Sequence, residues 1–277
     1  GAPPMRIARF PVLAVPLIAL LATALLAEPL ALVFEPEAGL EITYDLEAKG
    51  TRVMRVPGQA PVTAKIGFKA QRVDAFEGPG GAKMAMTRTL KDIRLTEDGQ
   101  RQEIPSSIRD KAVAFTADSR GNIIAVDKEW AAGAPEGFGD ILNLLETVPF
   151  GTGPVEIGDK WDASAPEDPD SESDAEIIKD VSEGQIVAIY ESDGMQVALI
   201  QQHVDAEMLY KDTPQEGLNM RASLRAEILQ SNRVEDGALL GIKGKLYQKI
   251  EVVSPQGATL LSIEMPDLEG TLRVAAE

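Results

Sequence analysis

Apolar and polar residues alternate along most of the chain after residue 40. The clearest run extends from Leu218 to Ile228, where every second residue is apolar, and similar runs begin at Leu40, Val62 and Leu240. Period-two alternation is typical of antiparallel strands that bury one face and expose the other. We therefore expect strands at residues 40–55, 62–76, 83–96, 100–104, 111–117, 122–127, 176–182, 185–191, 194–211, 217–232, 238–253, 258–265 and 270–275.

Turn residues between these runs support the same topology. Asp98-Gly99, Asp193-Gly194 and Asp236-Gly237 separate alternating segments, and such pairs favour the positive φ angles of tight hairpins. No helical crossovers separate the strands, which disfavours a βαβ fold. The sequence therefore predicts a mainly β protein with a large, curved antiparallel sheet, built as a half-barrel or as a sandwich.

One segment has helical instead of strand periodicity. Phe138, Ile141, Leu142 and Leu145 recur at spacings i, i+3, i+4 and i+7, and Pro149 ends the pattern. We expect one short amphipathic helix, which lies across an exposed face of the sheet or closes the mouth of a half-barrel.

The amino-terminal segment predicts contact with a membrane. Arg6 and Arg9 precede 18 uncharged residues, from Phe10 to Ala27. A basic segment before an apolar run is typical of exported proteins, and a helix of this length would be about 27 Å long, close to the ~30 Å hydrocarbon core. The residues expected to form the anchor are Phe10, Leu13, Leu17, Leu20, Leu21 and Leu25.

A cleavable signal peptide is the alternative, because Ala22-Thr23-Ala24 and Leu25-Leu26-Ala27 place small residues at plausible cleavage positions. We expect a signal-anchor or transmembrane segment over residues 1–34 and a β domain over residues 35–277, with a half-sheet boundary near 150–175. The expected location is the bacterial inner membrane, with a single pass and the main domain in the periplasm.

Composition excludes several classes of function. The chain of 277 residues has 27 Lys and Arg against 44 Asp and Glu, a formal charge of −17, which disfavours nucleic-acid binding. It has no cysteine and a single histidine, His203. Disulfides, thiolate catalysis and cysteine-ligated metals are therefore excluded, and a Ser–His enzyme would depend on one residue.

The remaining candidates for chemistry are weak. His203 and Asp205 lie two residues apart on one expected strand, about 7 Å apart at Cα and parallel, which is a poor geometry for a catalytic relay. The acidic segment 167–176 has Ser173 and Lys179 where a calcium loop starting at Asp168 needs Gly and Glu, so weak calcium binding is left open. The glycines of segment 78–81 lack a P-loop Lys. We expect a protein that is not an enzyme and has no cofactor.

Basic residues gather on the polar face of the two strands 217–232 and 238–253. The residues are Arg221, Arg225, Lys243, Lys245 and Lys249. They would form a basic stripe for anionic lipid headgroups or for an acidic partner, unless acidic residues of the flanking strands pair with them.

The segment Pro154-Val155-Glu156-Ile157-Gly158-Asp159-Lys160-Trp161 has the pattern Pro-x-x-x-Gly-Asp-x-Trp. In this segment and in the order of its hairpins, the chain resembles exported, β-rich bacterial envelope proteins of unknown function. The resemblance implies an exported β protein and no particular activity.

Two functions are compatible with these expectations. The first is a non-enzymatic accessory subunit, anchored in the inner membrane, whose partners are the bilayer and the integral membrane proteins of a larger complex, for example a respiratory, transport or photosynthetic one. The alternative is a periplasmic half-barrel carrier or chaperone for lipid or lipoprotein acyl chains, which requires an apolar cavity.

Overall fold

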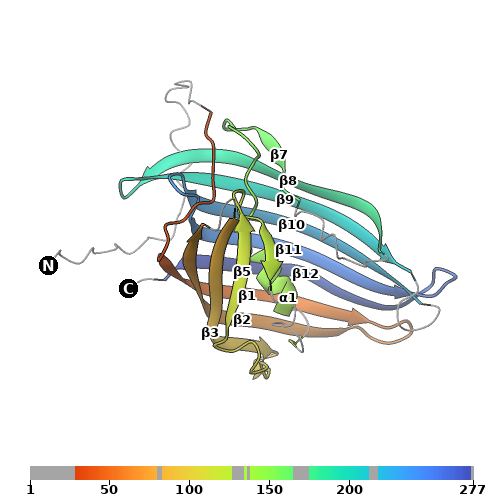
Figure 1. Cartoon of the computed structure of the whole chain (residues 1–277). Coiled ribbons are helices and arrows are strands. Elements are labelled where there is room, and N and C mark those ends of the chain that lie inside the picture. The colour runs from red at the N-terminus through yellow and green to blue at the C-terminus, as the bar shows by residue number, and fades with distance from the viewer. Residues whose placement is uncertain are drawn as a thin grey trace, which may run out of the picture.

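A computed structural model describes residues 29–79, 83–126, 134–135, 138–164, 175–211 and 218–275. In these residues the chain forms one antiparallel sheet and one helix, α1 (Phe138–Leu144) (Figure 1). The strands are β1 (Glu41–Arg55), β2 (Val62–Pro79), β3 (Lys83–Glu97), β4 (Gln100–Arg101), β5 (Ala112–Asp118), β6 (Ile123–Val126), β7 (Lys160–Asp162), β8 (Ala175–Ser192), β9 (Met195–Tyr210), β10 (Asn219–Arg233), β11 (Leu239–Val253) and β12 (Thr259–Val274). The expected mainly β class, with one antiparallel sheet and one helix, is confirmed.

The sheet consists of two meanders joined by their outer strands. Its order is β6-β5-β3-β2-β1-β12-β11-β10-β9-β8-β7, with β4 paired to β3 off this path. The first meander runs from β1 to β6 and the second from β7 to β12, and pairing of β1 with β12 makes them one continuous sheet. A sandwich of two separate sheets, one of the two expected forms, is therefore not observed. The strands of this sheet are visibly curved (Figure 1).

Several strand boundaries differ from expectation. Segments 176–182 and 185–191 belong to one strand, β8, and segments 258–265 and 270–275 belong to one strand, β12. Register shifts in β8 and in the β11–β12 pairing interrupt the alternation without ending the strands. Pro266 lies between Met265 and Leu268, at a register shift in the β11–β12 pairing. A proline is tolerated there because a ladder hydrogen bond is already missing. The short strand β7 was not expected.

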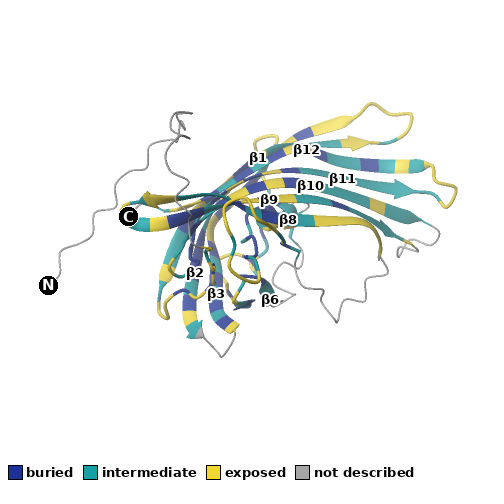
Figure 2. Cartoon of the chain, turned by 90° about the horizontal axis from the view of Figure 1, so that it is seen from above, coloured by how far each residue is buried: buried dark blue, intermediate teal, exposed yellow. Residues whose placement is uncertain are grey.

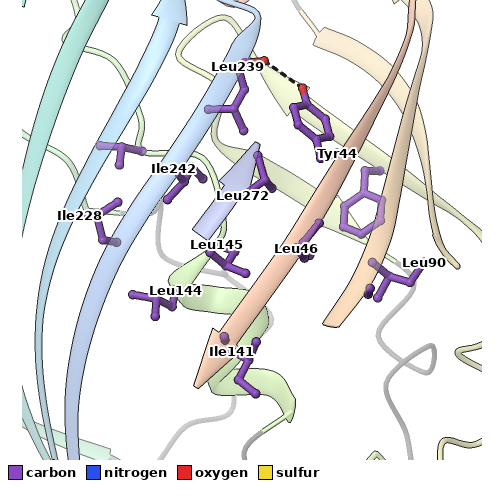
Figure 3. Packing of buried hydrophobic residues seen from close by; sticks show 14 of the residues in the cluster. Tyr44, Leu46, Leu90, Ile141, Leu144, Leu145, Ile228, Leu239, Ile242 and Leu272 are labelled. Carbon is purple, nitrogen blue, oxygen red and sulfur yellow. Dashed lines mark hydrogen bonds between the residues drawn. The ribbon is translucent and has the colours of Figure 1, made fainter. Parts of the chain in front are cut away.

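Helix α1 lies across one face of the sheet, as its periodicity predicts. Ile141 and Leu144 are buried in α1, and Leu145 follows its last turn into the same core (Figure 3). These side chains meet Leu46 of β1, Ile242 of β11 and Leu272 of β12. The Tyr44 hydroxyl donates to the Leu239 carbonyl at 3.0 Å, so this large buried side chain has its polar atom satisfied.

The expected membrane segment lies outside the described residues. Residues 1–28, including Phe10, Leu13, Leu17, Leu20, Leu21 and Leu25, are not among them. Within the described ranges, α1 is too short to cross a bilayer, and no other helix qualifies. The anchor therefore stays a prediction.

Candidate hydrophobic-binding face

The sheet extends well beyond α1. Figure 2 shows the ends of β8 to β12 and of β1 projecting away from the buried centre, with half-buried and exposed residues along them. Gln248 marks the limit of the helix, because its side-chain amide donates to the Asp140 carboxylate of α1 at 2.9 Å. That contact also fixes the orientation of β11: residues 248, 250 and 252 point to the side on which α1 lies.

Strand pairing extends this assignment to the neighbouring strands. Ile250 pairs with Ala222 on β10 and with Ile263 on β12, and Ala222 pairs with Met208 on β9. Directly paired residues point to the same face of a sheet. We call the resulting surface the distal face; it consists of Met54, Ile177, Met208, Tyr210, Met220, Ala222, Leu224, Ile250, Val252, Leu261, Ile263 and Met265.

The distal face is apolar and only partly buried. Met265 is buried, Met54 and Ile177 are 39% and 58% exposed, and the other members are half-buried. Four of the eight methionines of the chain belong to it. Methionine is unbranched and polarisable, so a surface rich in this residue adapts to ligands of irregular shape.

The opposite face of the same strands is ionic. Arg221 lies 3.5 Å from Glu207, and Arg225 lies 3.6 Å from Asp205. Both acidic partners come from β9, the strand paired with β10. One side of this part of the sheet is therefore hydrophobic, and the other is covered by ion pairs.

The structure brings the five residues of the expected basic stripe together, but with acidic neighbours. Lys245 pairs with Glu269 at 2.9 Å, and Lys249 pairs with Glu251 at the same distance. The hydrogen bond from Lys245 lowers the pKa of Glu269, to which Lys243 also contributes. The surface therefore carries mixed charge, as the sequence-based alternative of pairing with flanking acids predicts.

His203 does not pair with Asp205. Its Nδ1 lies 2.6 Å from Glu227 Oε1 on the neighbouring strand, while Asp205 binds Lys179 and Arg225. Residues two apart on a strand point in parallel, so cross-strand neighbours are closer. Among the described residues, no cluster of three or more His, Asp or Glu is arranged to hold a metal ion. Most of the acidic segment 167–176 lies outside them.

Sequence reasoning missed a buried ionic network beside α1. Asp74 accepts hydrogen bonds from both Arg72 and Arg88, and Arg88 also binds Glu146 at 2.6 Å. Arg72, Asp74 and Arg88 are at most 7% exposed. The sequence does contain a signal for this network. Alternation in β2 and β3 places the three charged residues on the same face as apolar residues such as Phe68, where charges are not expected.

The network fixes the charge states of its carboxyl groups. Burial alone would raise the pKa of Asp74, but Arg72 and Arg88 outweigh it and hold that pKa below its ordinary value. The same balance between burial and the two arginines lowers the pKa of Glu146. A cavity beside the network has a volume of about 10 Å³, which is room for about one water molecule.

Hydrogen bonds tie the chain after α1 to both meanders. Arg72 donates to the Leu145 carbonyl at 3.1 Å from β2. On the other side, the Gln230 side chain of β10 accepts from the Val148 amide at 2.7 Å and donates to the Val148 carbonyl at 3.1 Å. Because all these groups are buried, we assign the network a structural role that holds the two meanders around α1.

The Pro154–Trp161 segment is also structural in its geometry. Gly158 has a φ of 99°, and the Asp159 carboxylate accepts from the Glu156 amide at 2.9 Å, which closes the turn. Trp161 pairs with Gly184 and lies over it, and its indole donates to the Pro149 carbonyl at 2.8 Å. This segment therefore fastens the start of the second meander to β8.

The sequence matches no known family model, and no characterised protein matches it significantly. Among solved structures, a lipovitellin chain from a study of lipid–protein interactions aligns with 86% of this chain and 25% of its own length, at 10% identity and a TM-score of 0.45. The chain thus spans about a quarter of that protein. DynF from the dynemicin pathway of Micromonospora chersina aligns over 90% of both chains, at 11% identity and a TM-score of 0.24. A variant of Rhodopseudomonas blastica porin aligns over 84% of this chain and 99% of its own, at 7% identity and a TM-score of 0.24. Similarities at this level assign neither a family nor a function.

Proposed function

We propose that this protein is a non-enzymatic carrier that binds acyl chains of lipids or lipoproteins on its open distal face, in place of the enclosed apolar cavity expected from the sequence. The observation that carries the proposal is the difference between the two sides of the projecting sheet. The side that bears α1 presents aliphatic and methionine side chains, whereas the other side presents paired charges. An extended apolar surface on a strongly acidic protein is typical of a binding site.

The size of the face suits a hydrophobic ligand. Six strands at ~4.8 Å spacing give a width of about 24 Å, and the members span at most five residues along a strand, or about 17 Å. The product, roughly 400 Å², is an upper bound that lies within the range of the largest apolar patches on monomeric proteins.

The chemistry of the face favours acyl chains over a protein surface. Protein interfaces are enriched in Trp, Tyr and Arg anchors, whereas the distal face has Tyr210 as its single aromatic member. The Tyr210 hydroxyl points to the Met208 sulfur at 3.6 Å, so it makes a contact within the face itself. An acyl chain needs no hydrogen bonds, and it conforms to flexible methionines.

Two neighbouring residues of β10 provide a matched test. Ala222 lies on the distal face and Ser223 on the ionic face, and both are half-buried. We expect Ala222→Glu to weaken binding of a fluorescent fatty acid at least about tenfold, because a carboxylate on the face is costly to desolvate. Ser223→Glu should leave binding unchanged. Circular dichroism of both variants controls for folding.

Ile250→Glu, at the position paired with Ala222, is a second variant of the distal face and should weaken fatty-acid binding for the same reason. Absence of fatty-acid binding by the wild-type protein, or equal binding by the Ala222→Glu and Ser223→Glu variants, would overturn the proposal.

The second candidate is the membrane-anchored accessory subunit of a larger inner-membrane complex. It is favoured by the filled core, because α1 and the buried network leave a cavity of only about 10 Å³ beside them. In that case the distal face covers a surface of a partner protein. Native mass spectrometry separates the two candidates: copurified lipid supports the carrier, and stoichiometric protein partners support the subunit. Sequencing the mature amino terminus tests the anchor, because a start near Leu25 or Glu28 means that the anchor is removed.

A further inference from the structure

Two neighbouring hairpin ends of the sheet are free of charge. Residues 56–64, at the β1–β2 turn, and residues 252–263, at the β11–β12 turn, contain no Asp, Glu, Lys or Arg. What distinguishes these two stretches from other uncharged runs, such as residues 147–155, is that both form hairpin ends on neighbouring strands. We call the two hairpin ends together the uncharged tip.

Strand pairing places the two parts of the tip side by side. Met54 pairs with Ile263, and Arg55 pairs with Ser262, across the β1–β12 junction. Figure 1 shows both turns, orange and blue, at the same end of the molecule. The tip is therefore one continuous surface made from two parts of the chain that are distant in sequence.

Exposed aliphatic side chains surround this surface. Val62 is 59% exposed, Leu260 is 43% exposed and Met54 is 39% exposed. The turns themselves are formed by Pro, Gly, Gln, Ala and Ser, and most of their residues are exposed. The Arg55–Glu264 ion pair borders the tip. Beyond it, the water-exposed aliphatic groups are costly in water and suit an apolar environment.

Other turns of the sheet differ from the tip. The β3–β4, β5–β6, β8–β9 and β10–β11 connections each contain or adjoin an aspartate, namely Asp98, Asp118, Asp193 and Asp236. The glycine-rich β2–β3 turn is uncharged, but Glu77 and Lys83 flank it closely. The β9–β10 connection, at the same end of the sheet, contains Lys211, Asp212 and Glu216, so the lack of charge is specific to the β1–β2 and β11–β12 turns.

We propose that the uncharged tip inserts into the lipid–water interface of a membrane. Charged groups resist transfer into this region, whereas Val, Leu, Met and Pro side chains enter it at little cost. The net charge of −17 would repel an anionic surface, so the tip suits a zwitterionic one. Insertion would place the distal face next to the bilayer, where an acyl chain can move onto it. This contact is separate from the expected amino-terminal anchor.

The chain contains no cysteine, so a single introduced thiol can report on the tip. Gln256 lies in the β11–β12 turn, and Gln196 lies at the opposite end of the sheet; both are exposed. Gln256→Cys and the matched control Gln196→Cys are labelled with an environment-sensitive fluorophore. The full-length protein is then reconstituted into phosphatidylcholine vesicles with or without nitroxide-labelled lipid.

We expect the label at position 256 to shift its emission to shorter wavelength and to be quenched by nitroxide lipid. The label at position 196 should do neither. Val62→Asp combined with Leu260→Asp should abolish the shift at position 256. Ile157→Asp, at a position 51% exposed outside the tip, should leave the shift intact.

Equal emission and equal quenching at positions 256 and 196 would overturn the proposal. A shift without nitroxide quenching would also overturn it, because it would indicate a protein contact. The outcome is independent of the proposed carrier function. Ala222→Glu should retain membrane contact, because Ala222 lies on the distal face but outside the tip.

Discussion

Gly244 of β11 and Gly270 of β12 pair directly, and Leu144 of α1 occupies the space above them. A Cβ atom at residue 244 would lie 2.6 Å from Leu144 Cδ1, and one at residue 270 would lie 3.1 Å from Leu144 Cδ2. The two glycines therefore let the helix approach the sheet closely. With seven residues, α1 is too short to be stable alone. Its position therefore depends on its contact with the sheet at these two glycines.

Replacement of Gly244 should displace the helix. We expect Gly244→Val to lower the free energy of unfolding by about 1–3 kcal/mol, as measured by urea denaturation, because it overpacks the contact with Leu144. Adding Leu144→Ala should recover part of the loss, since the two positions are in contact. Gly139→Ala in α1 is the control, because a Cβ there meets no atom within 4 Å. Additive effects of the two substitutions would show that the contact is not the cause.

Loss of the Asp74 charge should be strongly destabilising. Asp74→Asn leaves Arg72 and Arg88 buried without their shared carboxylate, and such a change costs about 3–5 kcal/mol. The measurement is the denaturation midpoint at neutral pH. Glu269→Gln, which removes an exposed partner of Lys245, should have a much smaller effect. Equal effects of the two substitutions would contradict a structural role for the buried network.

Acid should destabilise the fold through the same network. The pKa values of Asp74 and Glu146 are lower in the folded protein than their ordinary values. A carboxyl group of this kind stabilises the fold above its unfolded pKa of about 4, and the contribution is lost as the pH falls toward the folded-state pKa. We expect denaturation midpoints to fall steeply below about pH 4. Asp74→Asn should show a flatter pH profile, and an unchanged profile in this variant would assign the acid sensitivity to other groups.

Gly184 should be required for the position of Trp161. A Cβ at residue 184 would lie 2.5 Å from the indole ring, so Gly184→Ala should displace the ring and weaken its hydrogen bond to the Pro149 carbonyl. Trp130 is replaced by Phe so that fluorescence reports on Trp161 alone. We expect emission at longer wavelength, with Gly153→Ala as a control, since a Cβ there meets no atom within 4 Å. Unchanged emission would mean that the ring has room that the packing does not indicate.

Reversal of charge on the ionic face should not control binding to anionic lipid. Arg221 and Lys245 already have Glu207 and Glu269 as partners, so little free positive charge is available. We expect the Arg221→Glu, Lys245→Glu double variant to bind anionic vesicles as the wild type does in a flotation assay. A marked loss of binding would show that the basic stripe contacts lipid despite these pairs.

Local sequence patterns predicted the elements but not their lengths. Alternation located the long strands, because one face of each is buried, and the 3.6-residue period located α1. Strand β12 was divided near the register shift between Met265 and Leu268, which interrupts the alternation while the strand continues. Strand β8 was divided at Glu183-Gly184, where its pairing with β9 is regular. Arg72, Asp74 and Arg88 occupy positions that the alternation assigns to the core. Their burial could not be predicted without knowing that they pair with one another, because an unpaired charge is excluded from the core.

Between register shifts, the sequence by itself determined which side chains share a face, because residues of a strand alternate between the two faces whatever the neighbouring strands are. It thereby placed Leu218 to Ile228 correctly and brought the five basic residues to one face. Only the tertiary structure decided what each face meets: acidic β9 residues beside the basic ones, α1 over Gly244 and Gly270, and β1 beside β12. The physical reason is that these contacts join residues far apart in the chain, and their energies depend on distances that local periodicity does not specify.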